Sequence, residues 1–251
     1  MIHFVGAGSG AVDLITLRGK LFIEKADVIV YAGSLINKQL LNFAKTDAEL
    51  YDSAYFCLDE IISILEQAER DGKTTVRLHS GDPSLYGAIR EQMHRLDRLG
   101  IEYDVCPGVS SFCGAAAALK AELTPPEISQ TVILTRIEGK TPVPEKENIR
   151  ELSEHGATMA VFLSAGMLSE LQVQLLSGGY TNDTPVAIVY KATWDDEKIV
   201  RGKLSELSVM GKEAGISKTA LVFVGEFLDG YPTCSSLYDK NFETAFRRRA
   251  K

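Results

Sequence analysis

The sequence predicts an α/β protein with two domains, the first on a mostly parallel five-stranded sheet and the second on a mixed sheet, with a ligand cleft between them. Short apolar segments alternate with helical patterns along the first half, which is typical of a parallel sheet. The pattern breaks at Thr124-Pro125-Pro126, a stiff and extended connection. We therefore expect an N-terminal domain over residues 1–120 and a C-terminal domain over residues 121–251.

Apolar and β-branched residues predict five strands in the first half. These are Ile2–Val5, Val28–Tyr31, Glu49–Asp52, Thr75–His79 and Glu102–Cys106. The clearest helix has one apolar face, formed by Leu58, Ile61, Ile62, Leu65 and Ala68. It is expected to end at Asp71-Gly72, because glycine tolerates the left-handed conformation of a helix stop. A later helix built on Ala115–Ala118 carries only small side chains, which favours close packing, most simply against the sheet.

The second half begins a new series of strands. These are Thr131–Arg136, Met159–Ser164, Val186–Lys191, Lys198–Arg201 and Ala220–Gly225. Helical stretches separate several of them, but the third and fourth are joined only by Ala192–Glu197. A loop that short permits a hairpin, so we expect antiparallel pairing there and a mixed sheet.

Composition limits the class of protein. A chain of 251 residues with 45% hydrophobic content can bury one large core or two modest ones. The net charge of −7 argues against a protein that coats nucleic acid or an anionic membrane. No apolar run reaches the roughly 18 residues that span a bilayer, and the chain opens on a strand rather than a charged leader. The cytoplasm is the expected location, with neither nucleic acid nor membrane as a partner.

Metal ligands are not grouped in this sequence. The cysteines are Cys57, Cys106, Cys113 and Cys234, with no Cys-x-x-Cys pair among them. The histidines are His3, His79, His94 and His155, which form no metal-binding helix motif. We expect free thiols that are buried or half-buried, and no metal site.

Three turns follow strands of the first half and carry most of the chemical signal. They are Gly6-Ala7-Gly8-Ser9-Gly10, Ser80–Gly87 and Pro107-Gly108-Val109-Ser110-Ser111. In an open parallel sheet, turns at the carboxyl ends of strands line the crevice where ligands bind. The sequence therefore predicts a binding site assembled from several loops.

The first turn by itself admits a dinucleotide-binding interpretation. Gly6, Gly8 and Ala11 satisfy Gly-x-Gly-x-x-Gly/Ala, a pattern that brings backbone close to a pyrophosphate. That interpretation also needs an acidic residue near the end of the second strand, to bind the ribose. The strand ends in Val30-Tyr31-Ala32-Gly33, and Asp27 lies at its other end. A nicotinamide cofactor is therefore disfavoured.

The other two turns leave structural and functional interpretations open. Asp82 has the chemistry to accept hydrogen bonds from an amine or a ribose hydroxyl, or to cap a helix starting near Ser84. Ser110 and Ser111 stand at a helix start, where hydroxyls are ordinary caps. Free amide groups at the same helix end would also suit a ligand carboxylate.

Several motifs carry a resemblance to a known family. Those shared across the family are Val5–Gly8, Leu14–Gly19, Ala26–Tyr31, Ser80–Pro83, Pro107–Ser111 and Val222–Gly225. Over essentially its whole length, the chain resembles the tetrapyrrole methyltransferases of the cobalamin pathway. Four stretches resemble the precorrin-4 C11-methyltransferase branch: Tyr31–Leu35, Leu134–Pro144, Val189–Trp194 and Ser236–Asp239. Ala32 stands where enzymes that methylate uroporphyrinogen typically carry aspartate, which speaks against that branch.

The resemblance implies transfer of a methyl group from S-adenosylmethionine to C11 of precorrin-4 or cobalt-precorrin-4, in a homodimer. It implies donor contacts from Ser80, Gly81, Asp82, Leu85, Tyr86, Ser110, Ser111, Ala165, Met167, Tyr190, Lys191, Ala192, Thr219 and Ala220. Arg136 and Lys140 are the candidates for binding the substrate carboxylates, with ordinary surface charge as the alternative. For Met167 the alternative is helix packing. No catalytic base is identified.

The first loop departs from the family pattern, which usually reads Gly-Pro-Gly-Asp-Pro or Gly-Pro-Gly-Ala-Pro. Here it reads Gly8-Ser9-Gly10-Ala11-Val12, and losing both prolines is expected to loosen it. Two other classes of function stay open at this point. One is a related methyltransferase acting on another acceptor, such as the diphthamide enzymes, which modify a protein. The other is a nonenzymatic nucleotide-binding or sensor domain.

Overall fold

The computed structural model describes residues 1–229, 235, 239 and 242–247. These residues form two compact units. The first unit holds Met1–Ala118 together with Lys191–Glu197, and the second holds Leu119–Tyr190 and the described residues from Lys198 onward. Cys106 is buried as expected, but Cys57 and Cys113 are exposed, because each lies at or near the start of a helix on the surface of the unit. Cys234 and three residues of the branch-specific stretch, 236–238, lie outside the described residues. The domain boundary between residues 120 and 121 and the cleft between the domains stay predictions.

The first unit is built on a parallel five-stranded sheet in the order β3-β2-β4-β1-β5. Its strands are β1 (Ile2–Gly6), β2 (Val28–Tyr31), β3 (Glu49–Asp52), β4 (Thr75–His79) and β5 (Tyr103–Cys106). All five predicted strands are confirmed, with ends that differ by one residue at most. The sequence order of the strands differs from their spatial order: β4 is the central strand, and β1 lies between β4 and the edge strand β5.

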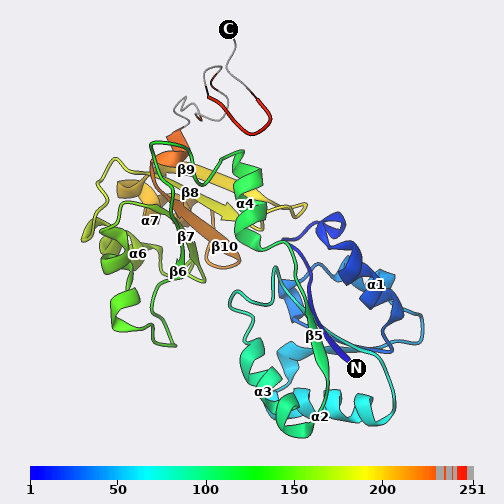
Figure 1. Ribbon diagram of the computed structural model, residues 1–251. Helices are drawn as coiled ribbons and strands as arrows, with labels where there is room; N and C mark the ends of the chain where they lie inside the picture. The colour runs from blue at the N-terminus through cyan, green and yellow to red at the C-terminus, as the bar shows by residue number, and fades with distance from the viewer. Residues whose placement is uncertain (230–234, 236–238, 240–241, 248–251) are drawn as a thin grey trace. The chain divides into compact units, whose positions relative to one another are not determined.

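Helices cover both faces of this sheet (Figure 1). The helices of the unit are α1 (Leu17–Lys25), α2 (Leu58–Arg70), α3 (Ile89–Leu99) and α4 (Ser111–Leu119). Val5 and Leu78 pack in one core cluster with Ile23 of α1. Phe4 and Val30 point to the other face and pack with α2 and α3. This division follows from the alternation of side chains along each strand.

One helix prediction is confirmed. The apolar face of α2 is buried against the sheet, and Gly72 after its end takes a φ of +68°. In α4, Ala115 and Ala116 are buried but Ala117 is exposed, so only part of the alanine run packs closely, and its packing against the sheet stays a prediction. Gly114, directly before this run, lies against the first turn, because a Cβ on it would lie 2.5 Å from the Cβ of Ser9.

The second unit is built on a mixed five-stranded sheet in the order β6-β7-β10-β8-β9. Its strands are β6 (Val132–Arg136), β7 (Thr158–Phe162), β8 (Pro185–Tyr190), β9 (Lys198–Lys203) and β10 (Ala220–Val224). β6 and β7 are parallel, and the other neighbours are antiparallel. The predicted hairpin between β8 and β9 is confirmed.

Three helices, α5 (Ile149–Ser153), α6 (Leu168–Leu176) and α7 (Leu207–Glu213), pack with this sheet in one core cluster (Figure 1). Leu171 of α6 and Leu207 of α7 are fully buried, together with Val161 and Ile188 of the sheet. Across both units, the helices formed by described residues are too short or too polar to cross a bilayer.

Candidate functional site

The three turns of the first unit meet at the carboxyl edge of its sheet, because β4, β1 and β5 are neighbours. Gly8 and Gly81 exchange two backbone hydrogen bonds, 3.2 Å from the Gly8 nitrogen to the Gly81 oxygen and 2.9 Å in the reverse direction. The amide of Ala7 also donates to the carbonyl of His79, at 2.7 Å. The first and second turns are thus joined by an isolated antiparallel bridge just beyond the ends of β1 and β4.

Glycine makes a closer approach possible where the three turns meet. A Cβ on Gly108 would lie 2.2 Å from the carbonyl oxygen of Gly81 and 2.7 Å from the Cα of Gly6. A Cβ on Gly6 would lie 2.6 Å from both of the other turns. Backbone therefore packs directly on backbone, and no side chain fits in this cradle of three turns.

Asp82 ties the second turn to the third. Its Oδ1 accepts from the backbone nitrogen of Ser84 at 2.9 Å, and its Oδ2 accepts from the backbone nitrogen of Gly108 at 2.9 Å. Partial burial raises the pKa of Asp82, but the hydrogen bonds from Ser84 and Gly108 outweigh it, so the pKa lies below its usual value. Asp82 caps a turn rather than an α-helix, because α3 begins only at Ile89.

The other predicted residues of the first unit lie around this cradle. Ser80 is exposed, Leu85 is half-buried, and Tyr86 is 44% exposed with a φ of +56°. Ser110 is buried, and Ser111 opens α4 with its backbone nitrogen 3.4 Å from the position of a Cβ on Gly81. The structure brings the second and third turns together as the sequence predicts.

The second unit gathers its predicted residues at one edge of its sheet. Arg136 pairs with Phe162 in the parallel ladder of β6 and β7, and Tyr190 pairs with Ala220 in the antiparallel ladder of β8 and β10. Because β10 runs antiparallel to both β7 and β8, its amino end lies at their carboxyl ends. Thr219, with a φ of +53°, precedes that end.

A buried serine fixes the loop that follows β7. The Oγ of Ser164 donates to the carbonyl of Phe162 at 2.6 Å and accepts from the amide of Ile137 at 3.1 Å. Ala165 is buried, and Met167 stands at the start of α6 and packs on the core cluster. Core packing therefore accounts for part of the role of Met167.

Leu163 was missed by the sequence reasoning. Its side chain is 71% exposed and its φ is +54°, an unfavourable conformation for a residue with a Cβ. Such outliers cluster at functional sites, so Leu163 joins the candidate residues of this edge. Nothing in the sequence signals it, because Leu163 lies inside the predicted strand Met159–Ser164, whereas β7 ends at Phe162.

The two substrate candidates differ in their surroundings. The guanidinium of Arg136 donates to the carbonyls of Ile137, Thr141 and Pro142, at 3.3, 3.1 and 2.7 Å. Lys140 lies in the loop that these bonds close, and its side chain is exposed. Arg136 therefore holds the loop, whereas Lys140 faces solvent.

Tyr190 and the two residues after it belong to different units. Tyr190 ends β8, whereas Lys191 and Ala192 begin the Lys191–Glu197 segment of the first unit. Lys191 forms an ion pair with Asp196 at 2.6 Å, and its Nζ lies 5.3 Å from the ring centroid of Trp194. Ala192 is buried.

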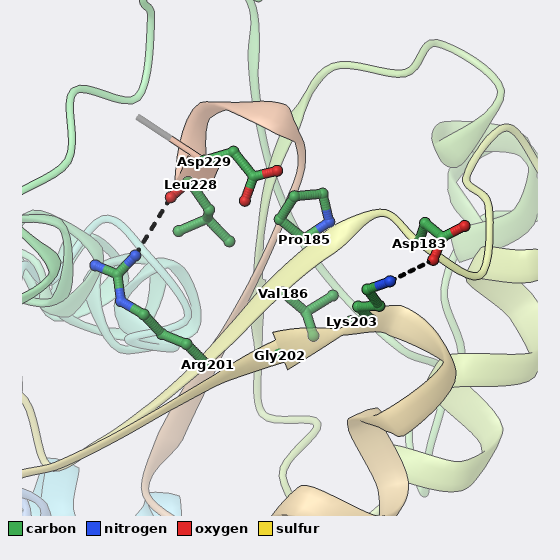
Figure 2. A pocket seen from close by; sticks show the side chains of 8 residues that line it. All are labelled: Asp183, Pro185, Val186, Arg201, Gly202, Lys203, Leu228 and Asp229. Atoms are coloured by element: carbon green, nitrogen blue, oxygen red, sulfur yellow. Dashed lines mark hydrogen bonds and ion pairs between the residues drawn. The ribbon is translucent and has the colours of Figure 1, made fainter. Parts of the chain in front are cut away.

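A hollow of about 310 Å³ lies at the other edge of the second sheet (Figure 2). Pro185 at the start of β8 and Lys203 at the end of β9 line it, with the ion pair between Asp183 and Lys203 at its rim. None of the predicted site residues lines it. The hollow is therefore separate from the candidate site.

The site offers binding groups rather than a reactive pair. Its cradle presents peptide groups, a carboxylate and the amino end of α4, which suit a ligand with amine, hydroxyl and carboxylate groups. His79, at the end of β4, is 4% exposed, and burial together with the charge of Arg77 lowers its pKa to about 3. The described residues contain no cluster of metal ligands.

Comparisons with known proteins agree with this geometry. Residues 1–208 match the model of the tetrapyrrole (corrin/porphyrin) methylases. The chain is 54% identical to a cobalt-precorrin-4 C(11)-methyltransferase of Methanocaldococcus jannaschii, over 100% of this chain and 97% of the relative. It is 42% identical to a precorrin-4 C(11)-methyltransferase of a Sinorhizobium species, over 100% and 99%. A solved structure of a cobalt-precorrin-4 methyltransferase superposes with a TM-score of 0.89, at 44% identity, over 91% of this chain and 96% of that one. The chain therefore belongs to the tetrapyrrole methylase family and is a methyltransferase.

Proposed function

We propose that this protein transfers a methyl group from S-adenosylmethionine to C11 of precorrin-4, with or without cobalt, in cobalamin biosynthesis. The observation that carries the proposal is the glycine cradle formed by Gly6, Gly81 and Gly108 in a chain of this family. The relatives named as C(11)-methyltransferases align with the whole of this chain. Both units therefore have counterparts in proteins named for this reaction.

The residues of the first unit fit the polar half of the donor. Asp82 is ionised at neutral pH, and its lowered pKa favours the charged form further, so it can attract an amine at the edge of the cradle. The backbone nitrogen of Ser111 at the start of α4 suits a carboxylate. Gly81, Leu85 and Tyr86 would add contacts to the ribose portion.

The contacts around adenine would come from the second unit and from the short segment that follows β8. The candidates of the second unit are Ala165, Met167, Tyr190, Thr219 and Ala220, and those of the following segment, which belongs to the first unit, are Lys191 and Ala192. Lys191 and Thr219 have positive φ values, and such outliers cluster at functional sites.

The chemistry needs little more than alignment. The donor carries its methyl on a sulfonium and leaves as a neutral thioether, so no acid has to assist its departure. The accepting ring carbon is electron-rich and enamine-like. Holding the two reactants in line can supply roughly 7–11 kcal/mol of barrier reduction. The binding groups found here, without a nucleophile and base pair, match such a reaction.

Basic side chains of the second unit would bind the acetate and propionate groups of the substrate. Lys140 is exposed and able to approach a carboxylate. Arg136 would act by holding the loop around Lys140, since its guanidinium is bonded to three carbonyls. A homodimer and a cytoplasmic location remain part of the proposal.

Methyl transfer with labelled S-adenosylmethionine tests the proposal, with cobalt-precorrin-4, precorrin-4 and uroporphyrinogen III offered side by side. Label at C11 of a precorrin-4 species is the expected result, and the preferred metal state identifies the substrate. Label in uroporphyrinogen alone would assign the chain to another branch of the family. Donor binding without transfer to any of the three would overturn the proposed acceptor.

A further inference from the structure

The first turn contains no proline and is held by hydrogen bonds to side chains. The backbone nitrogen of Ala11 donates to the Oγ1 of Thr193 at 3.0 Å. The hydroxyls of Ser9 and Thr193 lie 3.2 Å apart, within hydrogen-bond distance. When Thr193 accepts from Ala11, its own proton is available to Ser9, so one hydroxyl serves both ends of the turn. All three residues belong to the first unit.

Thr193 occupies an unfavourable backbone conformation to make these bonds. Its φ of +68° is an outlier for a β-branched residue. The strain is maintained by a carboxylate of Glu197, which accepts from the Thr193 backbone nitrogen at 2.6 Å, and by the turn bond from Trp194 to the Lys191 carbonyl at 3.0 Å. Strain that is held in this way marks a position where geometry matters.

The middle of the turn is held as well. A Cβ on Gly10 would lie 2.1 Å from the indole Cδ1 of Trp194, so the ring packs directly on this glycine. The side-chain amide of Asn37 donates to the Gly10 carbonyl at 3.0 Å. The first turn is thus restrained on both sides, although it has no proline.

We propose that Thr193 is a positioning residue for methyl transfer. Its hydroxyl fixes the first turn, and through the paired backbone of Gly8 and Gly81 the first turn supports the second. Ser9 takes part because it carries a hydroxyl, which the usual proline lacks. The predicted effect of Thr193 on donor binding rests on the proposed function. The restraint of the first turn by Thr193 does not depend on it.

The decisive substitution is Thr193→Val, which keeps the branched shape and removes both hydrogen bonds. Amide hydrogen exchange at Ala11 should become about tenfold faster, as expected for the loss of a pair of hydrogen bonds. The KM for S-adenosylmethionine should rise about tenfold, while kcat changes less than about threefold, because the substitution alters donor placement rather than the reacting atoms. Thr193→Ser should restore both values, since it retains the hydroxyl.

A matched control is Thr181→Val, which removes an exposed threonine hydroxyl from a turn of the second unit. It should leave Ala11 exchange and the KM unchanged. In a double-mutant cycle, Ser9→Ala should add little to Thr193→Val, because both remove the same contact. Unchanged exchange at Ala11 in Thr193→Val, or a serine variant as impaired as the valine variant, would overturn the proposal. If the wild-type protein binds no donor, the proposed function fails, and the exchange measurement still decides whether the restraint exists.

Discussion

The two units build their edges by different means. In the first unit the turns after β1, β4 and β5 meet through backbone, with Gly6, Gly81 and Gly108 in direct contact. In the second unit the loops after β6 and β7 are held by side chains, chiefly Ser164 and Arg136. Backbone contact leaves no room for any side chain, whereas a side-chain hydrogen bond can be lost with less change in shape. We expect substitutions at the first edge to have the larger effects.

The units also differ in what they bury. In the first unit Arg77 and His79 are almost fully buried on β4. The Arg77 guanidinium is bonded to the Gln92 side chain and to backbone carbonyls, and burial lowers its pKa to about 10. The buried polar residues described in the second unit are serines and threonines. Acid should therefore affect the first unit more strongly.

Gly108→Ala should have the largest effect. The new methyl group would lie 2.2 Å from the Gly81 oxygen, so the turns must separate, at a cost of about 3 kcal/mol of unfolding free energy. Binding of S-adenosylhomocysteine should fall by at least about 100-fold, measured by calorimetry. The control is Gly72→Ala, which has open space but a φ of +68°, and should cost about 1–2 kcal/mol without affecting binding. An equal loss of S-adenosylhomocysteine binding in Gly108→Ala and Gly72→Ala would contradict a special role of backbone contact at the first edge.

Asp82→Ala should come next. It removes the acceptor of the Gly108 and Ser84 amides, so donor-product binding should weaken by about 10- to 100-fold. Asp82→Asn should weaken donor-product binding almost as much. Its side chain has a single acceptor oxygen, so its NH2 group would face the backbone nitrogen of either Ser84 or Gly108. Calorimetry on both variants tests this, with Ser84→Ala as the milder control. Unchanged affinity in Asp82→Ala would refute its role.

Acid should reveal the buried histidine. Above about pH 6.5 His79 is neutral in both the folded and the unfolded chain, whereas between pH 6.5 and about 3 only the unfolded chain takes up the proton. The free energy of unfolding should therefore fall with decreasing pH, and His79 alone should contribute about 1.4 kcal/mol per pH unit. Denaturant unfolding of His79→Leu between pH 4 and 6 should show a correspondingly shallower slope. His94→Gln, at an exposed position, is the control for replacing a histidine as such, and a slope reduced as much as in His79→Leu would contradict the assignment to His79.

Ser164→Ala should have the smallest effect and tests the second edge. The substitution leaves the Ile137 amide without its acceptor and should cost about 1–3 kcal/mol of unfolding free energy. Donor-product affinity should change less than about fivefold, because the backbone of this loop keeps its own turn bond from Met167 to Ser164. A loss of affinity as large as that of Gly108→Ala would show that both edges are equally rigid.

Local patterns predicted the strands and the meeting of the turns. Alternating apolar residues identify β1 and β4, and a parallel sheet then brings their carboxyl ends to one edge. The pairing of Gly8 with Gly81 was beyond reach, because it depends on which strands become neighbours. Asp82 shows the same limit, since its second oxygen binds the backbone of Gly108, 26 residues away.

The second edge was less predictable, for a physical reason. In the sequence Arg136 is a candidate for binding a substrate carboxylate, with ordinary surface charge as the alternative. Neither interpretation foresees that the path of its own loop places three carbonyls around the guanidinium. Leu163 looks like the end of a strand, but a positive φ turns it outward. Both outcomes depend on backbone conformation in loops, where no periodicity guides the prediction.

The Lys191–Glu197 segment has a consequence for how the chain could be divided. It is encoded between β8 and β9 but belongs to the first unit, so the chain crosses from one unit to the other three times. A fragment that ends at Ala118 would contain the first turn but leave the Ala11 amide without Thr193 and Gly10 without the Trp194 ring. Such a fragment would therefore lack part of its own unit, and recovery of the first turn's contacts from two separate fragments would require the second fragment to supply this short segment.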